Sequence, residues 1–169
     1  MHWRGLPPSL RFPSNFCNTN TCATNGDPLH LGNGNLMTIS IIRDKSGAMR
    51  HHVHIGQHQF AVDEPPAVGG EDSGPNPHDL YDAALGSCKA LTLVWYAKRK
   101  NIPLEDLRVD VERDDKDERN GTYRLTTRIT LGGNLSDAQR QELLNVAGKC
   151  PIHKLMGSVT TEITTTLAD

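Results

Sequence analysis

The chain has 169 residues, of which 36% are hydrophobic, and this length predicts a single domain with a core of its own. Its 18 basic and 20 acidic side chains are mixed along the sequence and give a net charge of -2, so no basic patch predicts binding to nucleic acid. The longest apolar run, residues 90–97, is bounded by Lys89 and Lys98 and is too short to span a membrane. We therefore expect no nucleic acid and no membrane as a partner.

The first 35 residues are rich in Asn, Thr, Pro and Gly and show neither helical nor strand periodicity. Such a segment buries too little apolar surface to order itself, so we expect residues 1–35 to be a disordered or extended N-terminal extension and residues 36–169 to be the folded domain. Met37 stands where regular patterning begins and is a candidate start of translation. The N-terminus lacks the compact apolar run of a secretory signal, and we expect a cytoplasmic protein.

Cys17 and Cys22 lie in this extension with the spacing C-x4-C, and His30 is the nearest further ligand. A zinc site and a pair of incidental thiols both remain open. The second interpretation is favoured, because structural zinc sites usually need four closely spaced ligands.

Apolar and polar residues alternate in MTISIIRD, AMRHHVHI and QHQFAVD, which predicts an antiparallel meander of three strands. After a loop, a cap residue at Asn76 and a proline at position 77 predict a helix that continues to Lys100. Residues 83–97 are apolar on nearly every side, so we expect this helix to be buried all round. A chain of this size has too few residues to cover it alone.

The second half of the chain predicts a hairpin, two helices and a closing strand. LRVDVE and TYRLTTRITL alternate around a turn at Asn120-Gly121, and a capping box at Ser136 begins the helix SDAQRQELLNVAGK. A short helix follows Cys150, and SVTTEITTTLA closes the chain as a strand with Val159, Ile163 and Leu167 on one face. The order of elements indicates an α+β fold.

Two cysteines 62 residues apart are the strongest chemical signal. Cys88 lies in the long apolar helix, and Cys150 precedes Pro151 among Lys149, His153 and Lys154, an electropositive setting that favours thiolate. The free N–H groups at the start of the following helix also stabilise a thiolate at Cys150. A small buried hydrophobe remains the alternative for Cys88. We interpret the two residues as a redox pair.

The segments GGEDSGPNPHDLYDAALGSC, WYAKRK and LSDAQRQELLNVAGKCPIHK make residues 37–169 similar to the family of osmotically inducible and organic hydroperoxide resistance proteins (OsmC/Ohr). The resemblance implies an intertwined homodimer, with antiparallel sheets wrapped around two long central helices. It also implies a peroxidase of oxidative or osmotic stress defence that reduces organic, lipid-like hydroperoxides. The resemblance further implies that Cys88 becomes a sulfenic acid, that Cys150 closes a disulfide with it, and that a dithiol reductant of the lipoyl type reopens that bond. No cofactor and no metal are expected.

A thiolate at Cys88 needs a nearby cation, because an apolar helix raises the pKa of a thiol, and Lys89 points about 100° away around the helix. By resemblance, Arg50 matches the family arginine, although an exposed strand arginine is the alternative. Where hydroperoxide resistance members carry a glutamate ten residues before the reactive cysteine, this chain has His78, followed by Asp79. Either Asp79 takes over the carboxylate role or His78 acts as a neutral acceptor. Asp79 is otherwise a first-turn acid favoured by the helix dipole.

Two further alternatives remain open. His52, His54 and His58 share one strand parity and could face a metal, although a solvated polar face is favoured. His153 either tunes the Cys150 thiol or simply occupies a short helix. The rival to the enzyme is a non-catalytic, stress-associated binding protein that holds a hydrophobic small molecule at the dimer interface, and the missing glutamate favours it.

Overall fold

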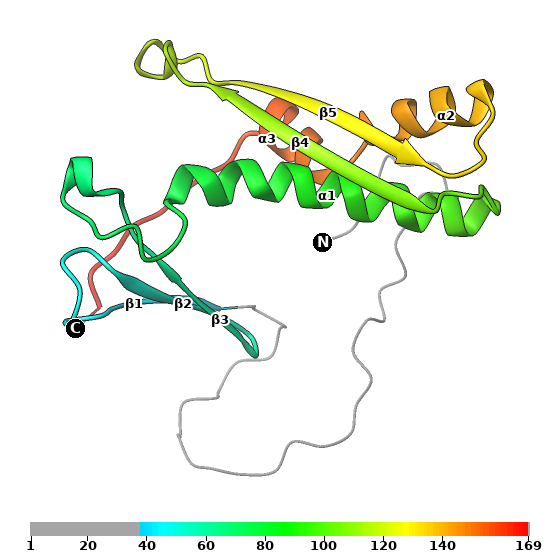
Figure 1. Ribbon diagram of the computed structural model, residues 1–169. Coiled ribbons are helices and arrows are strands. Elements are labelled where there is room, and N and C mark those ends of the chain that lie inside the picture. The colour runs from blue at the N-terminus through cyan, green and yellow to red at the C-terminus, as the bar shows by residue number, and fades with distance from the viewer. Residues whose placement is uncertain (1–37, 169) are drawn as a thin grey trace. The chain divides into compact units, whose positions relative to one another are not determined.

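The computed structural model describes residues 38–168, so the expected extension, with Cys17, Cys22 and Met37, lies outside the described residues. Two antiparallel sheets and three α-helices make up this part of the chain (Figure 1). The elements are β1 (Ile39–Arg43), β2 (His51–Ile55), β3 (His58–Val62), α1 (Pro77–Lys100), β4 (Asp106–Asp114), β5 (Arg124–Gly132), α2 (Asp137–Ala147) and α3 (Pro151–Ser158). The first sheet has the order β1-β2-β3 and the second pairs β4 with β5. The predicted α+β class is confirmed.

The long helix α1 begins and ends where the sequence predicts. The side chain of Asn76 accepts a hydrogen bond from the N–H of Asp79, and the Asp79 carboxylate accepts one from the N–H of Asn76. This capping box satisfies two of the N–H groups that a helix start leaves open. At the other end Asn101 adopts a left-handed conformation with φ 54° and stops the helix.

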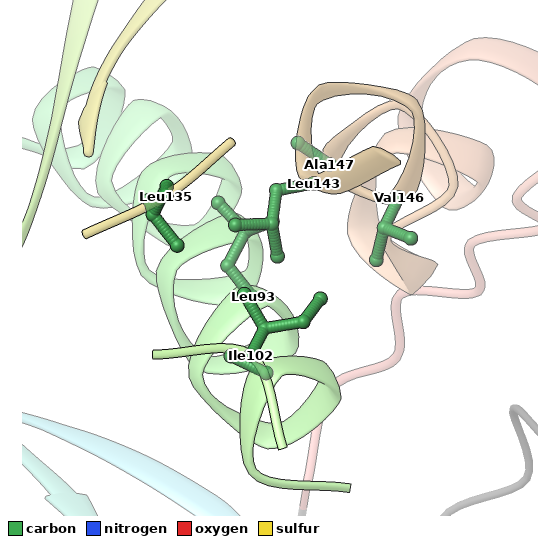
Figure 2. Packing of buried hydrophobic residues seen from close by; sticks show 7 residues of the cluster. Leu93, Ile102, Leu135, Leu143, Val146 and Ala147 are labelled. Atoms are coloured by element: carbon green, nitrogen blue, oxygen red, sulfur yellow. The ribbon is translucent and has the colours of Figure 1, made fainter. Parts of the chain in front are cut away.

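One face of α1 forms the hydrophobic core with α2 and the segments that flank it. Leu93 of α1 and Leu143 of α2 are fully enclosed and face each other (Figure 2). The remaining buried members of this cluster are Ala97, Ile102, Leu135, Val146 and Ala147. The β4–β5 hairpin also packs on α1, where a Cβ added to Gly86 would lie 2.9 Å from Val111 Cγ2. The core therefore fixes how α2, and with it the start of α3, lies against α1.

A second face of α1 is only partly covered within residues 38–168, so the expectation of burial all round is wrong for a single chain. Leu91 is 70% exposed and Tyr81 is 46% exposed. Tyr81, Ala84, Cys88, Leu91 and Trp95, which we name the seam face, lie within an arc of about 80° around the helix. Their spacing alternates between three and four residues, as in helices that pack along a second helix.

The predicted closing strand is also wrong for the single chain. Residues 159–168 take part in no sheet, and Ile163 and Leu167 are 82% and 98% exposed. The alternation of apolar residues was real, but a strand needs a partner for its N–H and C=O groups, and none is supplied in the described chain. The predicted alternating face therefore remains uncovered.

The loop between β3 and α1 is organised by Asp63, which is almost fully buried. Its carboxylate accepts hydrogen bonds from the backbone N–H groups of Glu64, Glu71 and Ser73 and from the Ser73 hydroxyl. The chain passes so close to itself here that a Cβ on Gly70 would lie 1.8 Å from the Glu64 carbonyl oxygen. This loop leads directly into Asn76, the N-cap residue of α1.

We expect Asp63→Asn to lower the free energy of unfolding at neutral pH. The hydrogen bond from the Ser73 hydroxyl, against the opposing effect of burial, lowers the pKa of Asp63 from 3.8 to about 2. The ionised carboxylate therefore stabilises the fold above about pH 4, and this stabilisation is lost as the pH falls toward about 2. Urea unfolding across this range measures the effect. Asp115→Asn, at an exposed carboxylate, is the control, and an Asp63→Asn protein with the wild-type pH dependence would contradict the prediction.

Candidate functional site

Cys150 lies at the junction of α2 and α3, where it caps the start of α3. Its backbone N–H donates to the carbonyl of Ala147, the last residue of α2. Its Sγ accepts a hydrogen bond of 3.4 Å from the N–H of His153, and Pro151 is the first residue of the helix. One of the N–H groups at the helix start, that of His153, therefore donates to this sulfur. The side chain is fully buried, with 0% exposure.

The two thiols that lie 62 residues apart in the sequence are neighbours in the structure. Cys88 is half-buried on α1, α3 contacts α1, and Cys88 lies close enough to Cys150 to raise the pKa of the Cys150 thiol. Both residues are free thiols. The structure therefore brings together the sulfurs of the predicted redox pair.

The expected thiolate at Cys150 is wrong in its net direction. Burial raises the pKa of the Cys150 thiol, and the nearby Cys88 adds to that rise. The N–H of His153 and the charge of Lys89 act in the opposite direction without reversing it. Lys149 and Lys154, which the sequence offers as electropositive neighbours, are exposed to solvent. Burial therefore favours the protonated form of Cys150, whereas the thiolate is the form that acts as a nucleophile.

Lys89 is the functional candidate that the sequence argument missed. Its side chain is only 3% exposed, and its ammonium donates to the carbonyl of Ala147 at 2.9 Å and to His153 Nδ1 at 3.1 Å. The helical wheel correctly excludes Lys89 from the seam face that carries Cys88. A helical wheel contains no information about other elements, so it does not reveal that the side of α1 that carries Lys89 faces the start of α3, near Cys150. The available signal was a charged residue inside an apolar run.

Thr92 carries a buried hydroxyl that has no hydrogen-bond partner within residues 38–168. It follows Cys88 by one turn of α1, so the two side chains project from the same side of the helix. An unsatisfied buried hydroxyl costs about 1–3 kcal/mol. In the described part of the chain, an unpaired hydroxyl therefore lies on the side of α1 that carries Cys88.

Arg50 lies at the start of β2 and is held by the turn that precedes it. Its Nε donates to Asp44 at 2.8 Å and its guanidinium also donates to the Ser46 hydroxyl at 2.7 Å. The same Asp44 carboxylate contacts His52 Nε2 at 3.2 Å. Hydrogen bonds from Ser46, followed by the one from Arg50, hold the pKa of Asp44 well below its usual range. No hydrogen bond joins Arg50 to either thiol in the described part of one chain.

Asp79 does hold an arginine, but that arginine is Arg113 of β4. Arg113 forms ion pairs with Asp79 and, at 2.7 Å, with the buried Asp82, which also accepts a hydrogen bond from Tyr123. Burial, followed by this hydrogen bond, raises the pKa of Tyr123 to about 12. Asp79 and Asp82 lie about 180° and about 120° around α1 from Cys88. This ion-pair cluster joins α1 to β4 on the side away from the seam face.

His78 contacts an acidic side chain of another element. Its Nε2 contacts Glu118 Oε1 at 3.0 Å, and this bond raises the pKa of the imidazole. His78 also lines an open pocket of about 390 Å³ together with Pro77, Tyr81, Glu118 and Tyr123. The structure therefore places His78 and Asp79 in separate interactions, neither of which includes Arg50.

The histidines of β2 and β3 do not share one face. A turn at Gly56 separates the two strands, and His58 pairs with Ile55, which places it opposite the parity of His52 and His54. Within residues 38–168, no three His, Cys, Asp or Glu side chains gather into a cluster that could hold a metal ion. None of the helices in this range is long and apolar enough to cross a membrane.

The fold resembles solved structures at low sequence identity. A putative osmotic stress induced and detoxification response protein from Psychrobacter arcticus is 20% identical with a TM-score of 0.61, covering 76% of this chain and 93% of its own. An OsmC-like protein from Mycoplasma pneumoniae is 19% identical with a TM-score of 0.59, covering 73% and 88%. An organic hydroperoxide resistance protein OsmC from Legionella pneumophila is 21% identical with a TM-score of 0.55, covering 74% and 93%. At these identities the likeness shows the fold alone.

No curated protein matches the chain. The family model for OsmC-like proteins matches residues 70–166, more than half of the sequence, and this range includes α1, the β4–β5 hairpin, both remaining helices and both thiols. The chain therefore belongs to the OsmC-like protein family.

Proposed function

We propose that this protein is a thiol peroxidase that reduces organic hydroperoxides with Cys88 and Cys150. The observation that supports the proposal is the closeness of a half-buried thiol and a fully buried one. A peroxide reaches the sulfur of Cys88, whereas Cys150 is enclosed beside it. This is the arrangement that a peroxidatic and a resolving cysteine need. The similarity in fold to the organic hydroperoxide resistance protein from Legionella pneumophila also supports organic hydroperoxides as the substrate class.

The reaction proceeds in two steps. The Cys88 thiolate attacks one peroxide oxygen, the O–O bond breaks, and the alkoxide takes up a proton and leaves as an alcohol. Cys88 then carries a sulfenic acid. The Cys150 sulfur attacks the Cys88 sulfur, the S–O bond breaks, the S–S bond forms and water leaves. An external dithiol reduces this disulfide and restores both thiols.

The surroundings of Cys88 favour an apolar substrate. Cys88 lies in the middle of the seam face, with Leu91, Trp95 and Tyr81 within about 100° around the helix. The open hydroxyl of Thr92 is a donor for the peroxide oxygen or for the sulfenic oxygen that remains on the sulfur. An organic hydroperoxide places its oxygens on the sulfur and its apolar part along this face.

We propose that the seam face is covered by a second copy of the chain in an intertwined homodimer. The spacing of the seam face fits a helix partner, and the exposed isoleucines of β1 and the unpaired segment 159–168 offer further apolar and backbone surface. A second copy supplies a helix, a sheet edge and a terminal segment of the same kind. Such an isologous contact uses each surface twice and closes after two chains.

In this dimer we assign Arg50 as the cation that stabilises the Cys88 thiolate, because Lys89 faces Cys150 and Arg113 is bound on the far side of α1. Asp44, rather than Asp79 or His78, is then the carboxylate that orients Arg50. The N–H donors of a guanidinium group lie in one plane with fixed directions. A carboxylate bound to one side of the group therefore fixes the direction of the donors on the other side.

The test is the chemical state of the thiols after one equivalent of cumene hydroperoxide. We expect each chain to lose two thiols and to yield a Cys88–Cys150 disulfide, identified by peptide mapping under non-reducing conditions. Hydrogen peroxide, which lacks the apolar part, is the comparison and should react more slowly. An unchanged thiol count with cumene hydroperoxide would overturn the peroxidase.

That result would favour the second candidate function, a non-catalytic protein that binds a hydrophobic small molecule. The observation in its favour is the open pocket beside His78, where Tyr81 of the seam face and Tyr123 meet edge to face with their ring centres 5.9 Å apart. In this case the thiols remain reduced and an apolar fluorescent probe binds without being consumed.

A further inference from the structure

Lys89 carries a buried positive charge that no carboxylate neutralises within residues 38–168. Its two hydrogen-bond partners, the Ala147 carbonyl and His153 Nδ1, are both acceptors. Transfer of an ammonium out of water is costly unless an opposite charge accompanies it. A chain that only needed to fill this space would be served better by a methionine or leucine. The free-energy cost of burying the Lys89 ammonium therefore indicates that its charge has a functional role.

The ionisable groups near Lys89 come from α1 and from α3 with its cap. Cys88 precedes Lys89 on α1 but points about 100° away, Cys150 is the N-cap of α3 and His153 lies on α3, whereas α2 contributes the carbonyl of Ala147. Of these groups, only the two cysteines can become anions. The charge of Lys89 acts on Cys150 and opposes the effect of burial on that thiol. A Cys150 thiolate is therefore the counterion that this pocket lacks.

His153 links Lys89 to Cys150. Its backbone N–H donates to Cys150 Sγ and its ring Nδ1 accepts from the Lys89 ammonium. Because an ammonium only donates, Nδ1 is the acceptor and a neutral ring carries its proton on Nε2. One residue thus holds the sulfur on one side and the cation on the other. These contacts favour the interpretation in which His153 tunes the Cys150 thiol.

We propose that Lys89, held by His153, is a positioning residue whose ammonium stabilises the Cys150 thiolate during its attack on Cys88. The proton that leaves Cys150 joins the hydroxide released from the Cys88 sulfenic acid and forms water, and Lys89 keeps its three protons throughout. The peroxide-dependent part of this inference rests on the proposed function. The effect of Lys89 on the Cys150 sulfur does not, and it is measured separately.

The first measurement uses a protein whose only cysteine is Cys150, with Cys17, Cys22 and Cys88 replaced by serine. Thiolate absorbance is titrated against pH, and a protein without Cys150 is subtracted. We expect Lys89→Met to move the titration midpoint to higher pH and Lys89→Arg to keep it near that of the unchanged lysine. Lys154→Met, at an exposed lysine of the same helix as Cys150, should leave it in place. An unchanged midpoint in Lys89→Met would overturn the inference.

The second measurement follows the attack of Cys150 without any peroxide. In a protein that keeps only Cys88 and Cys150, the more exposed Cys88 is first loaded with thionitrobenzoate from an aromatic disulfide reagent. Cys150 then attacks the Cys88 sulfur, the mixed disulfide breaks, and the coloured thionitrobenzoate leaves as its thiolate. We expect Lys89→Met to slow this release about tenfold at neutral pH, with a deficit that shrinks as the pH rises.

Two controls separate a charge effect from a structural one. The melting temperature of Lys89→Met should be equal to or above that of the wild type, because an uncompensated buried charge is removed. Slowing by the same factor at every pH would indicate a packing defect and would overturn the inference. If cumene hydroperoxide leaves the wild-type thiols intact while Lys89→Met still shifts both measurements, the peroxidase is wrong and the assignment of Lys89 stands.

Discussion

Replacing Cys88 by serine should reduce the consumption of cumene hydroperoxide in the presence of a dithiol by about a thousandfold or more. A serine hydroxyl is far less acidic than a thiol and does not form the anion that splits the O–O bond. Cys150 does not substitute for it, since its sulfur is fully buried and burial raises the pKa of its thiol. The rate of hydroperoxide loss measures the effect directly.

Two further variants make this comparison specific. Cys150→Ser should still consume about one equivalent of hydroperoxide per chain and leave a sulfenic acid at Cys88, which a sulfenic acid trap labels. A variant with serine at positions 17 and 22 should keep the wild-type rate, because the proposed chemistry uses neither residue. Equal rates in Cys88→Ser and the wild type would end the enzyme hypothesis.

Leu91→Asp should convert the proposed homodimer into monomers, with the dissociation constant raised roughly a hundredfold or more. Leu91 is the most exposed large side chain of the seam face. A second helix packed along that face would bury one aspartate from each chain without a cation to pair with. Sedimentation velocity over a range of protein concentrations measures the change.

Leu144→Asp is the matched control for this variant. Leu144 is also an exposed leucine in the middle of a helix, but it lies on α2, away from the seam face. It should keep both the dimer and the hydroperoxide activity, whereas Leu91→Asp should lose both. A wild-type protein that sediments as a monomer would contradict the dimer and the assignment of Arg50 that depends on it.

The parts of the fold that could be predicted from the sequence are those that local chemistry determines. The capping box of Asn76 and Asp79 determines where α1 starts, and the left-handed conformation of Asn101 determines where it ends. Both bounds of α1 were therefore confirmed to the residue. The two hairpins follow in the same way from alternation and turn residues. The pairing of Cys88 with Cys150 came from residue type and from a family resemblance, not from any local pattern.

Contacts between distant segments were harder to predict. We expected the carboxylate of Asp79 to orient Arg50, but it forms an ion pair with Arg113, which lies 34 residues away in the sequence. Lys89 was rejected as a partner for Cys88, and nothing local reveals that α3 returns to meet it. Residues 159–168 failed as a strand because their alternation specifies a face without specifying which chain supplies the neighbouring strand.

The unequal enclosure of the two sulfurs has a consequence for how the protein would age under severe oxidant stress. Irreversible conversion to sulfinic and sulfonic acids requires repeated encounters with oxidant, and of the two thiols in residues 38–168 it is Cys88 that is open to them. Damage would therefore accumulate on Cys88 while Cys150 stays chemically intact. Molecules inactivated in this way would be recognisable by a single acidic modification on α1.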